Sequence, residues 1–210
     1  MATTIRIKFF MDYICEWCCL GYRILQQLAD EYDFDLELYP LEIHPDAPER
    51  GMPMDWHIDN KEEWMLRMNQ LGAPYGITFK DKYYFANTHN ALIMGQYAKT
   101  HNKHREYTDL LWRIYMEEGR NISDRKVIEE IAYRLGFTMA QVEEAFTSGI
   151  YEAAMYRNKQ YHQSFGTDQV PCFVVNEEYI MIGAQSADTW RELFAQIEKE
   201  QSAPAPEDYE

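Results

Sequence analysis

The sequence contains the motif Cys15-Glu16-Trp17-Cys18, in which two residues separate two cysteines. Residues 5–10 before it alternate apolar and charged side chains and then turn apolar, which is typical of a strand entering a core. After it, the apolar residues from position 20 to position 32 recur with helical spacing. We therefore predict a strand, a short connection and a helix, with both cysteines at the start of the helix.

A cysteine pair in this position has a specific chemistry. The first turn of a helix offers unpaired N–H groups and a partial positive charge, which stabilise a thiolate on the first cysteine. The second cysteine lies one turn further on, within reach of a disulfide. A thiolate at Cys15 can attack a disulfide, and Cys18 can then resolve the mixed disulfide.

The remaining pattern predicts an α/β fold. Residues 33–39 alternate as a second strand, 40–54 form a proline-rich loop, and 172–175 and 179–182 form a hairpin that turns at Asn176. Ser186 is expected to cap a last helix over 187–199. The chain between loop and hairpin reads as helical, with predicted segments 62–71, 88–101, 105–118, one from an N-cap at Ser123 to Gly136, 138–148, and 150 to about 165.

Val170-Pro171 stands immediately before the first strand of the hairpin. A proline there fits a cis peptide bond opposite the cysteine pair, where it would expose backbone to an extended substrate.

These residues resemble the DsbA-like thioredoxin superfamily, and within it the FrnE-like cytoplasmic group. The resemblance runs nearly end to end and is carried by Asp12-Tyr13-Ile14-Cys15-Glu16-Trp17-Cys18-Cys19-Leu20-Gly21, His44-Pro45-Asp46-Ala47-Pro48, Asn87-Thr88, Glu117-Glu118-Gly119, Ile122-Ser123-Asp124, Val170-Pro171, Phe173-Val174 and Gly183-Ala184-Gln185. It implies a thioredoxin fold with a large helical insertion, a nucleophilic Cys15, a resolving Cys18 and a cis-Pro171.

The order of the predicted elements and the composition of the last ten residues divide the chain into three parts. Residues 1–44 and 166–200 would form the thioredoxin-like domain, 45–165 the inserted helical domain, and 201–210 a disordered acidic tail. Trp17, Glu16, Val170 and Pro171 would contact the substrate. The family usually has proline where Glu16 stands. Because a carboxylate opposes a neighbouring thiolate, we hypothesise that Glu16 makes this protein less oxidising than a periplasmic DsbA, and that Glu16→Pro favours the thiolate.

Composition narrows the class of protein. The 210 residues carry a net charge of −15, which disfavours a nucleic-acid partner. No apolar run is long enough for a membrane span, and the first ten residues read as a strand rather than a signal peptide. We therefore expect a cytoplasmic protein, where a structural disulfide framework is improbable.

Two further thiols and the histidines leave alternatives open. Cys19 and Cys172 are interpreted as core residues, with a regulatory thiol and a place beside the disulfide as the alternatives. A zinc site made from the four cysteines lacks the usual two separated pairs, so no metal and no cofactor are expected. His162 precedes the proline loop and is the histidine of most interest.

The sequence is compatible with three functions. The first is a thiol–disulfide oxidoreductase or isomerase acting on a disulfide-containing protein or a small thiol substrate. The second, by resemblance, is a glutathione-dependent isomerase or transferase of the hydroxychromene-carboxylate isomerase or kappa type, in secondary metabolism. The third is a non-enzymatic chaperone. A homodimer through the insertion stays open.

Overall fold

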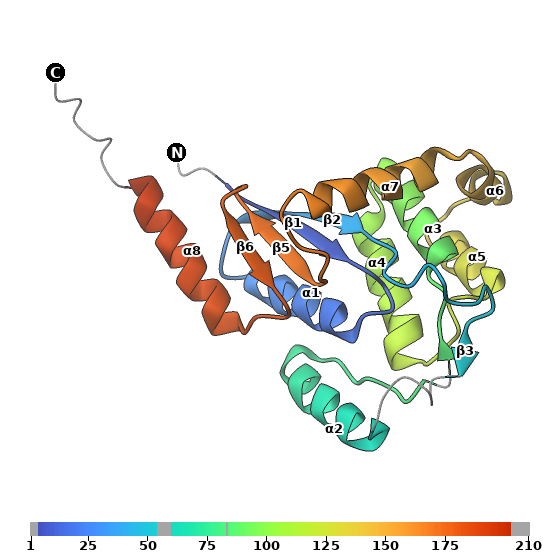
Figure 1. Cartoon of the computed structure of the whole chain (residues 1–210), viewed down its shortest axis with the longest axis horizontal. Coiled ribbons are helices and arrows are strands. Elements are labelled where there is room, and N and C mark those ends of the chain that lie inside the picture. The colour runs from blue at the N-terminus through green and yellow to red at the C-terminus, as the bar shows by residue number, and fades with distance from the viewer. Residues whose placement is uncertain (1–3, 54–59, 83, 203–210) are drawn as a thin grey trace.

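A mixed β-sheet forms the centre of the molecule. The computed structural model describes residues 4–53, 60–82 and 84–202. Within these ranges four strands form one sheet in the order β2-β1-β5-β6 (Figure 1). The strands are β1 Ile5–Met11, β2 Phe34–Pro40, β5 Cys172–Val175 and β6 Tyr179–Ile182. β1 runs parallel to β2, and β5 runs antiparallel to both β1 and β6.

The β5–β6 hairpin has the bounds that the sequence predicts. Asn176 and Glu177 adopt positive φ angles of 51° and 65° in the three-residue connection 176–178, as in a type I′ turn, and the Glu178 N–H donates to the Val175 carbonyl over 3.0 Å. Cys172 of β5 lies opposite Phe10 of β1 on one side and Ile182 of β6 on the other. This register brings the start of β5 to the end of β1, where the chain leads to the cysteine pair.

One face of the sheet is covered by α1 (Glu16–Leu28) and α8 (Ala187–Ser202). The ring of Phe9 stacks on that of Phe173 with centroids 4.4 Å apart, and Trp190 of α8 packs edge-on against Phe173 at 5.1 Å. Ser186 caps α8 as predicted, because its Oγ accepts the Thr189 N–H over 3.1 Å. Phe9 also stacks on Tyr22 of α1, with centroids 6.4 Å apart, and this contact packs the helix that carries the cysteines against the sheet.

The opposite face is covered by α7 (Ile150–Gln163). A second, smaller core lies beneath it, built from the buried side chains of Phe10, Leu41, Cys172 and Val174. Phe10 contacts Tyr161 of α7, with ring centroids 5.9 Å apart. The sheet is therefore buried on both faces at the strand ends that lead to the cysteine pair.

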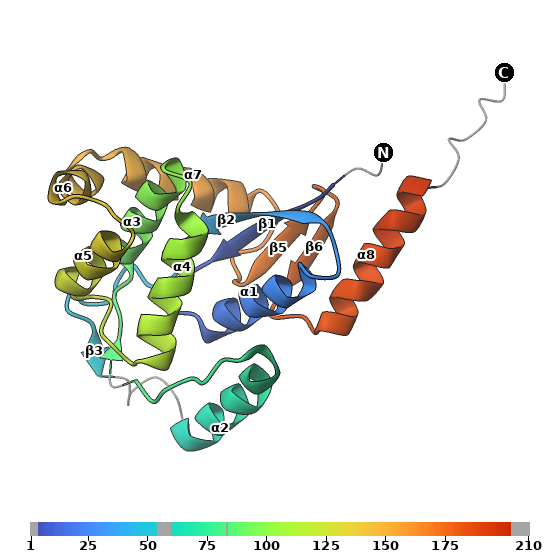
Figure 2. The same ribbon diagram turned by 180° about the vertical axis from the view of Figure 1, so that it is seen from behind.

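The chain between β2 and β5 is mostly helical, and this confirms the predicted insertion. Its elements are α2 Lys61–Gly72, the short helix η2 Ala73–Tyr75, α3 His89–Thr100, α4 His104–Trp112, the π-helical turn η3 Arg113–Glu117, α5 Arg125–Arg134 and α6 Met139–Thr147. Figures 1 and 2 show α3 to α6 grouped beyond the β2 edge of the sheet, whereas α2 lies apart from them, beside α1.

Some predicted boundaries are wrong. The helix predicted over 105–118 ends as the π-helical turn η3. The predicted loop 40–54 contains a two-residue strand, β3 (Met52–Pro53), which pairs with β4 (Tyr84–Phe85). Such short pairs carry no alternating pattern of their own, so the sequence does not reveal them.

The N-cap of α5 is also corrected. Asp124 rather than Ser123 caps the helix, because its Oδ1 accepts the Lys126 N–H over 3.0 Å. Ser123 Oγ instead accepts the Asn87 N–H over 2.8 Å. At the C-terminus, α8 continues through Ser202, so the first two residues of the predicted tail are helical, and residues 203–210 lie outside the described residues.

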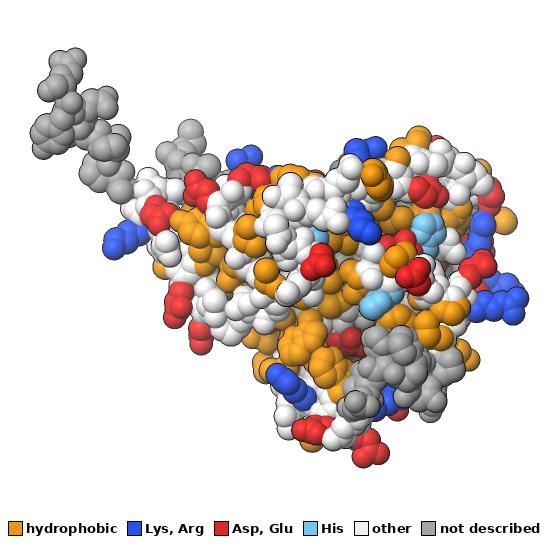
Figure 3. All heavy atoms as spheres, viewed as in Figure 1, with side chains coloured by type: hydrophobic (Ala, Val, Ile, Leu, Met, Phe, Trp, Pro, Cys, Tyr) orange, Lys and Arg blue, Asp and Glu red, His pale blue; other side chains and the backbone are white. Residues whose placement is uncertain are grey.

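The surface mixes acidic, basic and apolar side chains (Figure 3). Two apolar side chains of the edge strand β6, Ile180 and Ile182, are 46% and 41% exposed. None of the helices in the described ranges has the length and apolar character needed to cross a membrane.

Candidate active site

Cys15 is the N-cap residue of α1. The chain leaves β1 at Met11 and turns through Asp12, whose carbonyl accepts the Cys15 N–H over 3.2 Å. The Sγ of Cys15 then accepts the backbone N–H of Cys18, also over 3.2 Å. Sulfur thus occupies the place of a capping oxygen and accepts one N–H of the first helical turn. The N-terminus of a helix is the end at which negative charge is favoured.

The two cysteines differ in their surroundings. Both are free thiols, but Cys15 is partly exposed and Cys18 is fully buried. Burial raises the pKa of the Cys18 thiol well above its usual value, and its hydrogen bond with Cys15 and the charge on Cys15 raise it further. Cys18 is therefore favoured in its protonated form, whereas Cys15 is partly open to the solvent.

A buried carboxylate, Asp12, lies beneath the pair and was not identified from the sequence. Its Oδ2 accepts the Ile43 N–H over 2.9 Å and its Oδ1 the Ile14 N–H over 3.3 Å, and Thr88 supplies a side-chain hydrogen bond. Burial raises the pKa of Asp12 to about 6, against the lowering effect of these hydrogen bonds. Its charge is one of the influences on the Cys18 thiol. The signal in the sequence is a single acidic residue inside an apolar run.

The Val170–Pro171 peptide bond is cis, as predicted. Because Cys172 lies opposite Phe10, Pro171 is placed beside Met11. It therefore lies at the end of β1, where the loop to Cys15 leaves the sheet. The carbonyl of Pro171 accepts the Gly183 N–H over 2.8 Å. Val170 is partly exposed, so this loop presents backbone at the edge of the sheet that holds the cysteines.

Glu16 is paired with a lysine from the insertion. Lys82 Nζ lies 2.7 Å from Glu16 Oε1, and the two side chains are only 3% and 15% exposed. Burial is the largest influence and acts to lower the pKa of Lys82, but the attraction and hydrogen bond of Glu16, together with Tyr115 and Cys19, outweigh it and the pKa is raised. The carboxylate beside the nucleophile is therefore neutralised, a feature that the hypothesis for Glu16 did not include.

Trp17 packs against α2. Its ring meets that of Trp64 edge-on, with centroids 5.8 Å apart, and the Arg67 guanidinium lies 5.7 Å from the Trp17 ring centroid. Trp17 is only partly buried. Both residues between the cysteines are thus held by the inserted segment that runs from α2 to Lys82.

The other two cysteines lie in cores. Cys19 is 1% exposed and points into the main core, and Cys172 is fully buried in the core under α7. Burial raises the pKa of Cys172 to about 11 and that of Cys19 further. His162 is buried on α7 against the Phe10 ring. Among the described residues, no three His, Cys, Asp or Glu side chains are grouped so that they could hold a metal ion.

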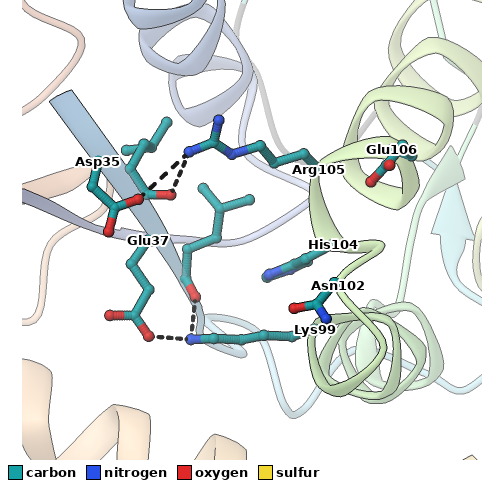
Figure 4. A pocket seen from close by; sticks show the side chains of 9 residues that line it. Asp35, Glu37, Lys99, Asn102, His104, Arg105 and Glu106 are labelled. Atoms are coloured by element: carbon teal, nitrogen blue, oxygen red, sulfur yellow. Dashed lines mark hydrogen bonds and ion pairs between the residues drawn. The ribbon is translucent and has the colours of Figure 1, made fainter. Parts of the chain in front are cut away.

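A pocket of about 360 Å³ lies at the β2 edge of the sheet and holds none of the predicted site residues (Figure 4). There Lys99 and Arg105 donate to the carbonyls of Leu38 and Leu36, which satisfies part of the free edge of β2. His104 lines this pocket, and its Nε2 lies 3.3 Å from the hydroxyl of Tyr13 in the Cys15 loop.

Comparison with known proteins places the chain in a family. The model of the DSBA-like thioredoxin domain matches residues 6–195. The chain therefore belongs to the DsbA-like thioredoxin family, whose members are oxidoreductases or isomerases. The curated protein YwbO of Bacillus subtilis (strain 168), described as uncharacterized, is 22% identical over 199 residues, which cover 93% of this chain and 98% of YwbO.

Solved structures share the fold. A probable DsbA oxidoreductase, SCO1869 from Streptomyces coelicolor, is similar with a TM-score of 0.81 at 18% identity, covering 95% of this chain and 92% of that one. The structure of a 2-hydroxychromene-2-carboxylate isomerase is similar with a TM-score of 0.72 at 12% identity, covering 93% of this chain and 95% of that one. The cytosolic disulfide reductase DsbM from Pseudomonas aeruginosa, solved with GSH, is similar with a TM-score of 0.64 at 16% identity, covering 91% of this chain and 98% of that one.

Proposed function

We propose that this protein is a thiol–disulfide oxidoreductase that uses Cys15 and Cys18 as its redox pair. The observation that carries the proposal is the asymmetry of the two thiols. Cys15 Sγ is partly exposed and capped by backbone N–H, whereas Cys18 is buried and holds its proton. Membership of the DsbA-like family supports the same assignment.

The reaction begins at Cys15. Its thiolate attacks one sulfur of the substrate disulfide, a mixed disulfide forms, and the other substrate sulfur leaves as a thiolate. Cys18 then loses its proton and attacks Cys15 Sγ, which releases the second substrate thiol. The substrate gains two electrons, and the protein is left with a Cys15–Cys18 disulfide. Two equivalents of an external thiol such as glutathione return the pair to the dithiol form.

Asp12 is the group placed to take the Cys18 proton. It is buried beneath the pair, and its pKa of about 6 makes it a base at neutral pH. A carboxylate held by three hydrogen bonds stays in position during the proton transfer. Asp12 therefore assists the second step, in which Cys18 must become a thiolate, and not the first.

The substrate is a disulfide in a protein or a small thiol compound, presented as an extended segment beside Val170 and Pro171. Trp17 lies at the rim and provides an apolar contact. We place the protein in a reducing cytoplasm, where the dithiol form dominates and reduction or isomerisation is favoured over net oxidation. The likeness to a cytosolic disulfide reductase supports this placement.

Trapping the mixed disulfide tests the assignment of roles. Cys18→Ser removes the resolving thiol, so oxidised glutathione should leave one glutathione covalently bound at Cys15, detected by intact-mass spectrometry. Cys15→Ser should bind none under the same conditions, since Cys18 is buried. Modification of Cys18 in the Cys15→Ser variant, or no adduct in Cys18→Ser, would reject the proposed roles.

A glutathione-dependent isomerase is the second candidate, because the fold also matches an isomerase structure. In that case the helix start would hold the thiolate of glutathione without disulfide exchange. Reduced glutathione would then bind the Cys15→Ser/Cys18→Ser variant with unchanged stoichiometry in calorimetry. The presence of both cysteines in a capping geometry favours the oxidoreductase.

A further inference from the structure

Lys82 is an unusual lysine because it is almost completely buried. Its side chain is 3% exposed, whereas lysine is rarely buried unless it is paired. The ammonium lies 2.7 Å from Glu16 Oε1, 3.1 Å from Met116 Sδ and 4.2 Å from the centroid of the Tyr115 ring. Glu16 is the one anion among these three partners.

The position of this ion pair in the fold is specific. Glu16 is the first residue of α1 and directly follows the N-cap Cys15, whereas Lys82 is 66 residues away in the segment that joins η2 to β4. The other charged groups that act on the neighbouring Cys19, Arg23 of α1 and Glu117 of η3, pair with each other over 3.8 Å. Among the described residues, Lys82 is the cation whose ion pair with Glu16 the structure shows.

We propose that Lys82 is a positioning residue that permits a glutamate beside the nucleophile, by neutralising Glu16 and thereby preserving the Cys15 thiolate. The inference rests on the proposed function, and Lys82 acts through Glu16 rather than on the substrate. An unpaired carboxylate next to Cys15 would oppose the thiolate, and an unpaired ammonium would favour it. The inserted segment thus tunes the redox pair of the thioredoxin-like sheet.

This proposal predicts effects of opposite sign for the two partners. Loss of Lys82 should raise the pH midpoint of Cys15 ionisation, and loss of Glu16 should lower it. Removing both should return the midpoint close to that of the parent. A structural role alone would not produce opposite shifts that cancel.

The test is a cycle of Lys82→Met, Glu16→Gln and the double variant, each in a Cys18→Ser background. The rate of Cys15 alkylation by iodoacetamide is followed against pH. Lys80→Met is the matched control, because Lys80 is an exposed lysine two residues earlier on the same segment, and it should leave the midpoint unchanged.

The result that overturns the proposal is a midpoint that does not move in Glu16→Gln, or that moves in the same direction in both single variants. If Lys82→Met fails to fold, the midpoints of Glu16→Gln and of the double variant still test the proposal. The double variant leaves neither charge unpaired. Failure of the proposed function is distinguished separately, since the ionisation of Cys15 is measured without any disulfide substrate.

Discussion

The Asp12 carboxylate accepts a hydrogen bond from the Ile43 backbone N–H over 2.9 Å. This bond joins the loop that leads to Cys15 with the loop that follows β2. Asp12 is fully buried, and burial raises the pKa of its carboxyl to about 6. The same carboxylate is the group that we propose as the acceptor of the Cys18 proton.

Asp12→Asn should change how stability depends on pH. The folded protein holds the Asp12 proton up to about pH 6, above the ordinary pKa of 3.8, so stability falls as pH rises between these values. The shift corresponds to roughly 3 kcal/mol, which the parent loses between pH 4 and pH 7 and the variant does not. Urea unfolding of both proteins across this range measures the difference. A difference that is constant with pH would contradict the assignment.

His104→Gln should make the free energy of unfolding depend less on pH below neutrality. Burial, with Lys99 as a smaller cause, lowers the pKa of His104 to about 3. The neutral ring is favoured in the folded state, so its contribution is complete above pH 6.5 and is lost as pH falls. Between pH 7 and pH 4 the free energy of unfolding of the variant, measured by chemical denaturation, should fall by about 3 kcal/mol less than that of the parent. His101→Gln, at an exposed position, is the control, and equal slopes for parent and His104→Gln would refute the effect.

The Glu16–Lys82 pair should show strong coupling in stability. Each single variant, Glu16→Gln or Lys82→Met, leaves one buried charge without a partner and should cost about 3–5 kcal/mol. The double variant removes both charges and should cost much less than the sum. Denaturant midpoints of the four proteins give the coupling energy. Additive single effects would show that the two side chains do not depend on each other.

Gly95→Ala should destabilise the protein although it places a better helix former in α3. A Cβ at position 95 would lie 2.6 Å from the hydroxyl of Tyr13, a side chain that is fully buried and cannot move aside. Helix propensity alone predicts a gain of about 1 kcal/mol, whereas overpacking predicts a loss of about 1–3 kcal/mol. The sign of the change in the thermal unfolding midpoint decides between helix propensity and overpacking. A stabilised variant would mean that the Tyr13 side chain is not held tightly.

The sequence predicts the elements around the cysteine pair well. Alternation and an apolar run define β1, and the turn chemistry of Asn176 defines the β5–β6 hairpin. The position of the cysteines at a helix start follows from the local pattern, and so does the cis-Pro171 from its place before β5. These features depend on neighbouring residues along the chain, which is the information that a sequence pattern carries.

The partners of the site were not predictable in the same way. Lys82 stands in Lys80-Asp81-Lys82, which reads as a solvated charge run, and its contact with Glu16 spans 66 residues. The link between Tyr13 and His104 spans 91 residues. Such pairs are set by how the insertion packs on α1 and β1. Asp12 differs, because a lone acid within an apolar run could have been identified as a buried carboxylate.

The redox equilibrium of the Cys15–Cys18 pair shows whether these two thiols form the redox centre of the protein. The protein is equilibrated in glutathione buffers of increasing oxidised fraction, quenched with acid, alkylated and analysed by mass spectrometry after digestion, with Cys15→Ser as control. We predict one reversible two-electron transition that joins Cys15 to Cys18 and is absent from the control. An unchanged dithiol across all buffers, or a transition that persists in Cys15→Ser, would contradict the account.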